Sequence, residues 1–281
     1  MTEVEHANWA APSNVKACTT LVTGGVSQGI YKGLNLGGHV GDCVEHVDKN
    51  RELVSEELGF PNQPYWLNQV HGVTVIRAQN VLQSIEGSSC AEGSLPAEGS
   101  LLAEGSLPAE GSSFAEGSST TPPDADGAFT FSKGVVCAIL TADCMPVFLT
   151  TRSGDRVALL HAGWRGLADG IIEYGVNALD CPTDQVLAWV GPSIGPNAFE
   201  IGDEVRQQLG GSDGAYKSSD NSTQANEKWF ANLYQLAGER FKQLGVHAYS
   251  HSQACTFSDQ RFYSYRRSGQ CGRMASFIWF E

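Results

Sequence analysis

Cys144 and His161 are residues whose side chains commonly bind metal ions, and they lie at the two ends of a predicted β-hairpin. The turn is indicated by Arg152-Ser-Gly-Asp155, which separates two apolar, strand-like runs. If the turn holds two or four residues, His161 lies opposite Pro146, and Cys144 is its diagonal neighbour on the same face, within about 7–8 Å. A three-residue turn would shift the register and separate the two side chains. The hairpin therefore predicts a shared metal site, conditional on its turn length.

A third ligand must come from elsewhere, and His71, within Asn68-Gln-Val-His-Gly72 before a predicted strand, is the best-placed histidine. Two or three protein ligands with one open position are typical of catalytic zinc, so we expect Zn²⁺. The same ligands also suit copper, and Met145 is a conceivable axial ligand. Neighbouring strand residues point to opposite faces, however, so Met145 should face away from Cys144. Copper remains the alternative.

Asp143 and Arg165 are candidate catalytic residues beside the metal ligands. Asp143 precedes the thiol, where it could orient a ligand, act as a general base, or simply cap a turn. Arg165 lies in the segment HAGWRG, which starts at His161 and leads into a predicted helix. A helix start and an arginine together favour an anion, so this segment predicts a phosphate site; an ordinary strand-to-helix turn is the alternative.

Three arginines near the C-terminus, Arg266, Arg267 and Arg273, stand out in an otherwise acidic chain. We expect surface ion pairing to explain at least one of them. Binding of a phosphate-bearing or ribose-bearing substrate is the alternative interpretation.

The elements that must position these residues alternate without a regular βαβ rhythm. Strands are predicted at 15–23, 73–78, 127–131, 135–141, 147–151, 156–161, 186–190 and 274–280. Helices are predicted from Asp42, with Glu45 as a capping-box partner, to Gly59, and over 166–179 and 229–244. This order favours mixed sheets covered by helices over a doubly wound parallel fold.

Composition limits the class of protein. The net charge is −13, of which six acids belong to one repetitive segment, and this balance argues against nucleic acid or an anionic membrane as partner. The N-terminus lacks the pattern of a secretory signal, and the longest apolar run is too short to span a membrane. We therefore expect a cytoplasmic enzyme for small molecules, with most of its eight cysteines reduced.

The repetitive segment consists of five AEGSxx hexads at 91–120, preceded by IEGSSC. Each hexad has little apolar content to offset the entropy lost on ordering, so we predict a flexible low-complexity insertion at about 84–123 within a single domain. A hexapeptide β-helix is disfavoured because the units lack a regular β-branched position.

Several spaced motifs resemble the laccase-domain, or polyphenol oxidase-like, proteins. They are NLGGHVGD at 35–42 with Asn50-Arg51, NQVHG, ADGAFT, TADCMPV, HAGWRG, VGPSIGP and SYRRSGQCGRMAS. The resemblance runs from about Val15 to the C-terminus. It implies an α+β fold of four layers, α/β/β/α, with mixed β-sheets, and zinc ligands at His71, Cys144 and His161. Within these motifs, Asn35, Arg51, Gln69, Arg266 and Arg267 are the candidate substrate- and phosphate-binding residues.

The resemblance also implies the chemistry. Members of the family are described as purine nucleoside phosphorylases that cleave adenosine, inosine and methylthioadenosine and also deaminate adenosine. We therefore expect zinc, phosphate and a purine nucleoside as partners of a monomer or homodimer. A copper-dependent polyphenol oxidase is the runner-up, and a peptidoglycan-precursor editing hydrolase with Cys144 as nucleophile is a third possibility.

Overall fold

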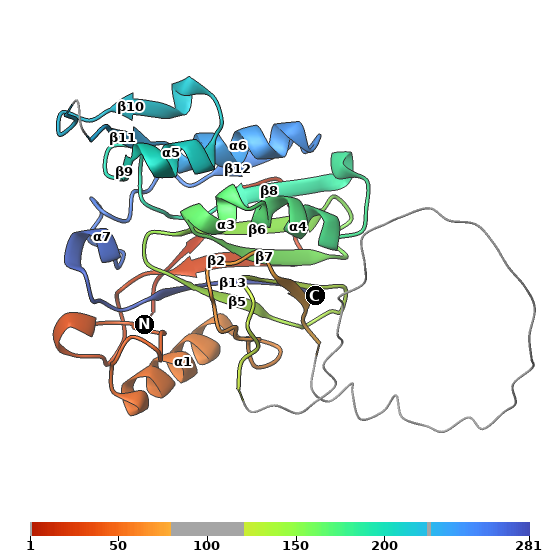
Figure 1. Cartoon of the computed structure of the whole chain (residues 1–281). Helices are drawn as coiled ribbons and strands as arrows, with labels where there is room; N and C mark the ends of the chain where they lie inside the picture. Colours follow the sequence, from red (N-terminus) through yellow and green to blue (C-terminus); the bar gives the residue numbers. More distant parts are fainter. Residues whose placement is uncertain (1, 80–120, 224–225) are drawn as a thin grey trace, which may run out of the picture.

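Two β-sheets lie face to face in the middle of the molecule, with helices on their outer sides (Figure 1). The computed structural model describes residues 2–79, 121–223 and 226–281. The predicted insertion at 84–123 therefore lies, apart from its C-terminal end, outside the described residues.

The larger sheet has six strands and carries the predicted hairpin. Its order is β12 (Ala248–His251), β8 (Val186–Val190), β6 (Met145–Thr151), β7 (Val157–Ala162), β4 (Gly127–Thr130) and β3 (Val75–Arg77). The outermost pair at each edge is parallel and the inner pairs are antiparallel, so this sheet is mixed.

The other sheets are antiparallel. The four-stranded sheet has the order β1 (Val4–His6), β2 (Val15–Thr20), β13 (Met274–Phe280) and β5 (Cys137–Thr141). A small third sheet contains β10 (Tyr216–Ser218), β11 (Lys228–Ala231) and β9 (Glu200–Gly202). The expectation of mixed sheets thus holds for the six-stranded sheet only, and the third sheet was not expected.

Three apolar clusters separate the layers. Between the two main sheets, Phe148, Leu159 and Trp189 pack with side chains of the four-stranded sheet such as Ile139 and Ile278. The outer face of the six-stranded sheet packs against α4 (Ile171–Ala178) and α6 (Leu233–Gln243). On the opposite side, α1 (Val44–Leu58) covers the four-stranded sheet (Figure 1). The layers therefore follow the order helix, sheet, sheet, helix.

Helix boundaries differ from the prediction where local signals compete with the apolar pattern. The segment predicted as one helix over 166–179 forms α3 (Trp164–Ala168) and α4, separated at Gly170, whose φ of 97° is left-handed. The predicted helix over 229–244 begins only after Asn232, whose side chain accepts a hydrogen bond from the backbone of Gln235. Residues before Asn232 pair in β11 instead, so the apolar pattern there belongs to a strand.

The predicted helix after Asp42 is present but begins at Val44, with Cys43 as N-cap. The Asp42 carboxylate does not form the expected capping box; it accepts hydrogen bonds from Ser27 and Asn35. Gly59 ends α1 with a left-handed φ of 61°, as its position predicted.

The remaining helices among the described residues are short. They are α5 (Asp203–Leu209), α7 (Tyr265–Ser268), and the 3₁₀ turns Gly29–Tyr31, Thr183–Gln185 and Asp213–Ala215. None of the helices within the described residues has the length and hydropathy to cross a membrane. The seven cysteines in the described part are all free thiols.

Candidate metal centre

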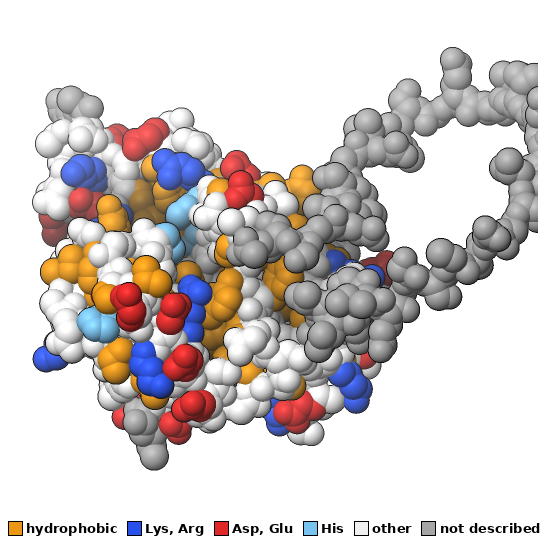
Figure 2. Space-filling view, turned by 90° about the horizontal axis from the view of Figure 1, so that it is seen from below, with side chains coloured by type: hydrophobic (Ala, Val, Ile, Leu, Met, Phe, Trp, Pro, Cys, Tyr) orange, Lys and Arg blue, Asp and Glu red, His pale blue; other side chains and the backbone are white. Residues whose placement is uncertain are grey.

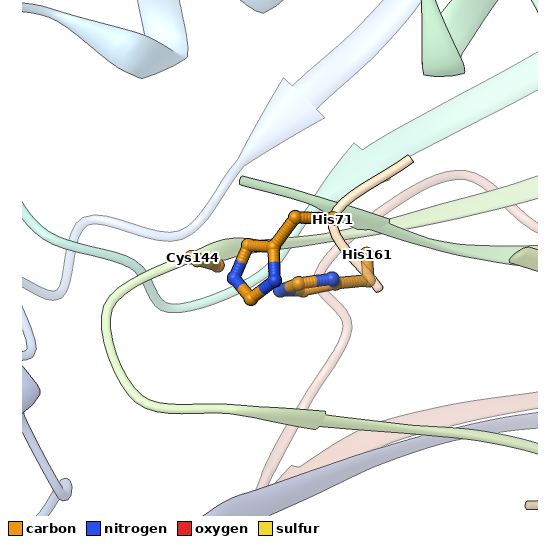
Figure 3. A group of neighbouring side chains, drawn as sticks. All are labelled: His71, Cys144 and His161. Carbon is orange, nitrogen blue, oxygen red and sulfur yellow. The ribbon is translucent and has the colours of Figure 1, made fainter. Parts of the chain in front are cut away.

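The side chains of His71, Cys144 and His161 converge at one end of the space between the two main sheets. Their potential ligand atoms all lie within 4.8 Å of one another. In Figure 3 the rings of His71 and His161 lie side by side, with Cys144 next to them. The ring centroids of the two histidines are 4.8 Å apart, with the ring planes 77° to each other. The predicted group is therefore present and could hold a metal ion.

Strand pairing sets the position of two of these ligands. Pro146 pairs with His161 across β6 and β7, which is the predicted register. Side chains alternate along a strand, so His161 lies on the same face as Leu159, which packs between the sheets. Met145 is fully buried in the cluster on the helix-covered face. Because that is the opposite side of β6, Met145 is not placed to be an axial ligand.

Asp126, to which the sequence assigned no role, organises the histidine ligands. Its Oδ1 lies 2.8 Å from Nδ1 of His161. Its carboxylate also accepts the backbone N–H groups of Val70, His71 and Gly72 at 3.2, 3.0 and 2.6 Å. His71 has a left-handed φ of 62°, and these bonds stabilise that conformation. One buried carboxylate therefore orients two of the candidate ligands. Asp126 lies in ADGAFT, one of the motifs that carry the resemblance, and this motif was the signal that could have pointed to it.

The charges of Cys144 and His161 depend on each other. Burial opposes ionisation of both, but the neighbouring His161 lowers the pKa of the Cys144 thiol to about 6. Burial likewise opposes the charge on His161, whereas the thiolate and Asp126 raise its pKa to about 9. Without a metal ion, the negative charge on Cys144 and the positive charge on His161 therefore stabilise each other.

The three residues fit a divalent cation by donor chemistry and by space. Asp126 engages Nδ1 of His161, which leaves Nε2 as its ligand atom. Gly163 keeps the surroundings open, because a Cβ there would lie 3.0 Å from Cδ2 of His71 and 3.3 Å from Sγ of Cys144. Two imidazole nitrogens and a thiolate suit zinc or copper, with a further position available to a ligand.

A cavity of about 330 Å³ opens beside the three ligands. Besides the ligands, its lining comprises His39, Gln69, Leu140, Thr141, Ala142, Asp143, Ile194, Phe199, Tyr265, Arg266 and Arg273. Of the predicted site residues other than the ligands, the cavity thus brings together Gln69, Asp143 and Arg266. The lining also contains Arg273, for which the sequence left substrate binding as the alternative to surface ion pairing. His39 and Tyr265 were not predicted as site residues, although both lie in motifs that carry the resemblance.

Asp143 lines the cavity but is engaged in holding it together. It has a left-handed φ of 92°. Oδ1 accepts the hydroxyl of Thr256 at 2.6 Å, and Oδ2 accepts the backbone N–H of Arg266 at 2.7 Å. The carboxylate therefore connects the loop that carries Cys144 to the start of α7.

Gln69, which also lines the cavity, fixes a second segment of the chain in place. Its side-chain amide donates to the carbonyl of Leu140 at 2.8 Å and accepts the backbone N–H of the same residue at 2.7 Å. The segment that carries His71 is thereby fixed to β5.

The two adjacent arginines of α7 have different environments. Arg266 lines the cavity, donates from Nη1 to the carbonyl of Glu200 at 2.9 Å, and is exposed. Arg267 does not line the cavity, and its guanidinium donates to the backbone carbonyls of Thr256, Phe257 and Phe262. Arg267 is thus placed to fix the backbone.

Asn35 and Arg51 do not line the cavity. Asn35 is fully buried and accepts the backbone N–H of Arg273 at 2.9 Å. Arg51 donates twice to the carbonyl of Leu36 and lies 4.1 Å from the Trp66 ring. Asn35 thus joins the motif at 35–42 to the residue just before β13, and Arg51 joins the same motif to α1.

Arg165 lies outside the cavity lining. Its guanidinium is exposed and lies 4.4 Å from the ring of Trp164. The structure therefore separates Arg165 from the cavity, although it is only four positions from the ligand His161.

Comparison with known proteins defines the class. The model of the family described as multi-copper polyphenol oxidoreductase laccase matches residues 16–281. The chain belongs to this family, as the laccase-domain motifs predicted.

The relatives are bacterial. The chain is 39% identical over 277 residues to the purine nucleoside phosphorylase PA4543 of Pseudomonas aeruginosa, covering 98% of this chain and 97% of that protein. It is 36% identical over 280 residues to the purine nucleoside phosphorylase YfiH of Escherichia coli, covering 99% of both. Among solved structures, Neisseria meningitidis protein NMB0706 superposes with a TM-score of 0.78 at 35% identity, covering 99% of both chains.

Proposed function

We propose that this protein is a zinc-dependent purine nucleoside phosphorylase that cleaves adenosine, inosine and methylthioadenosine and also deaminates adenosine. The observation that carries the proposal is the His71, Cys144 and His161 group beside a cavity, in a chain alignable over almost its whole length with proteins named purine nucleoside phosphorylases. Within the described residues this is the one such group of potential ligands, which favours a single ion.

In phosphorolysis, an oxygen of inorganic phosphate bonds to C1′ of the ribose while the bond from C1′ to the purine nitrogen breaks. The base leaves with the bonding electrons and takes up a proton, and ribose 1-phosphate is the other product. Zinc, when bound, supplies a Lewis acid in the cavity. Asp126 keeps His161 in the tautomer that presents Nε2, while Gln69 and Asp143 hold the flanking loops.

In deamination, water adds to the purine ring carbon that carries the amino group, and ammonia leaves. We propose Asp143 as proton carrier for this reaction, as its place in the cavity lining permits. Its carboxylate would have to exchange one of its two hydrogen bonds for one to the substrate.

The test is incubation of the purified protein with adenosine and phosphate, followed by separation of the products. We expect adenine with ribose 1-phosphate, together with inosine. A chelator should abolish both activities and added zinc should restore them. Absence of free base and inosine would contradict the proposal.

A copper-dependent polyphenol oxidase is the second candidate, because the family description names multi-copper oxidoreductases. The structure offers one ligand group in the described residues and places Met145 on the opposite strand face, which does not favour several copper ions. Oxygen uptake with a phenol after copper loading would support this candidate.

A cysteine hydrolase acting on peptidoglycan precursors is the third candidate. It is favoured by the pKa of Cys144, which His161 lowers, against the effect of burial, to about 6. A chelator would leave such an enzyme active, so the same chelation experiment separates it from the zinc enzyme.

We also infer a cytoplasmic monomer or homodimer with small molecules as its partners. Light scattering coupled to size-exclusion chromatography would establish the oligomeric state, and a trimer or larger assembly would contradict this inference.

A further inference from the structure

We infer that Arg273, with His39 and the hydroxyl of Thr141 beside it, forms the binding site for inorganic phosphate, and that Arg165 does not. The inference rests on the proposed function, which requires a free oxyanion next to the nucleoside. All three residues line the cavity beside the metal ligands, whereas Arg165 lies outside it.

Arg273 is held in place by its own backbone surroundings. Nη1 donates to the carbonyls of Cys271 and Gly272 at 2.9 and 3.1 Å. The side-chain stem lies against Gly37, where an added Cβ would be 2.8 Å from Cγ of the arginine. The guanidinium is therefore positioned before any ligand arrives, which lowers the entropy cost of binding.

The rest of the guanidinium is free to bind. Within the described part of the chain, Arg273 forms no ion pair, and all its side-chain hydrogen bonds use Nη1. The edge formed by Nε and Nη2 is thus unoccupied by these residues. Two parallel N–H groups on this edge match two oxygens of a phosphate.

The charges that act on His39 are positive, which favours an anion at this end of the cavity. Burial and the positive charge of Arg273 lower the pKa of His39, and the charges of Arg51, His161 and His71 act in the same direction. The one carboxylate in the lining, Asp143, already accepts two hydrogen bonds. The whole chain, by contrast, has a net charge of −13, and the face in Figure 2 shows acidic and basic side chains next to each other.

An unpaired hydroxyl gives independent support. Thr141 is 1% exposed, and its Oγ1 has no hydrogen-bond partner among the described residues. Thr141 pairs with Met274 across β5 and β13, so it is next to the point where Arg273 enters the cavity. A buried hydroxyl without a partner is unfavourable, and a phosphate oxygen bound at Arg273 would supply the partner.

The matched experiment removes one arginine at a time. Arg273→Gln and Arg165→Gln delete the same charge, one inside the cavity and one outside it. At saturating inosine, we expect Arg273→Gln to raise the KM for phosphate by about 10- to 100-fold, the loss of a charged two-pronged contact. Arg165→Gln should change it by less than about twofold, as for an exposed surface charge.

Two milder variants keep the test informative if Arg273→Gln does not fold. Arg273→Lys retains the charge but loses the two-pronged geometry, and Thr141→Val removes only the hydroxyl. Each should raise the KM for phosphate by about 3- to 30-fold, with a smaller change in the KM for inosine. Circular dichroism verifies the fold of each variant.

Calorimetric titration with inorganic phosphate separates this inference from the proposed function. If the wild type binds phosphate and Arg273→Gln does not, the inference stands even when no phosphorolysis is found. If phosphorolysis occurs and only Arg165→Gln raises the KM for phosphate, the inference is overturned while the proposed function stands. Equal phosphate binding by wild type and the Arg273 variants, or none by the wild type, also overturns it.

Discussion

The space between the two main sheets is apolar in its middle and polar at one end. The middle is filled by fully buried side chains, among them Ile139, Phe148 and Leu159. The end of the same three chain segments carries Thr141, Cys144 and His161. The candidate metal centre thus continues the strand faces that form the core, with different residue types.

This difference shows how the fold gives the site its geometry. Residues two apart on a strand share a face, so the pairing that packs Leu159 in the core also fixes His161 one step further along β7. Substitutions in the middle should therefore mainly affect stability, and substitutions at the end should mainly affect metal binding and catalysis.

The largest effect is expected at the polar end, from Cys144→Ala. Loss of the thiolate removes a metal ligand, and the Lewis acid contributes several kcal/mol to such reactions, so activity should fall by about 10³-fold or more. Phosphorolysis rates and metal content of the variant check this. Full activity with bound metal would contradict the role of Cys144.

The matching change in the apolar middle is Phe148→Ala. Phe148 is fully buried, and its ring centroid lies 5.0 Å from that of Trp189. We expect a loss of about 3–5 kcal/mol in the free energy of unfolding, measured by urea denaturation. The folded fraction of the variant should bind metal as the wild type does. If the folded variant lost its metal, the middle and the end of the space between the sheets would not have the separate roles described above.

A smaller effect is expected from Asp126→Asn. The substitution keeps the shape but removes the charge that orients His161 and accepts three backbone N–H groups. Loss of a carboxylate that hydrogen-bonds to a metal-binding histidine typically lowers metal affinity by about 10- to 100-fold. Competition with a metal-binding dye measures the change, and an unaltered affinity would show that His161 needs no carboxylate.

The smallest change is the response to one unit of pH. The metal competes with protons, which Cys144 holds below its pKa of about 6 and His161 below its pKa of about 9. Between these values one proton must leave, so these two groups should weaken binding about tenfold per unit as the pH falls, and more steeply below pH 6. Titration in buffers of different ionisation enthalpy counts the protons, and a pH-independent affinity would contradict the assignment.

Local patterns predicted much of the fold. The hairpin turn and strand alternation were enough to place His161 opposite Pro146, because pairing within one hairpin depends on nearby residues. Apolar spacing alone extended a helix across Gly170 and assigned Trp229 to a helix rather than to β11. The competing signals, a left-handed glycine and a strand partner far along the chain, depend on tertiary structure.

Contacts between distant segments explain what the sequence did not supply. Asp126 is 35 positions from His161 along the chain. Arg273 comes from the C-terminal region, and it lines the cavity while its backbone bonds to Asn35 and its side-chain stem lies against Gly37. Arg165 drew attention by its proximity along the chain, yet its side chain stacks on Trp164 outside the cavity. Nearness in sequence was therefore a good guide within the hairpin, whereas at the turn into α3 it did not bring Arg165 into the cavity lining.

The most direct test of the metal centre is elemental analysis of the protein purified without added metal, with Cys144→Ala as the control. We expect about one zinc ion per wild-type chain and little or none in the variant. Several copper ions per chain, or the same zinc content in both proteins, would contradict a single zinc ion bound by His71, Cys144 and His161.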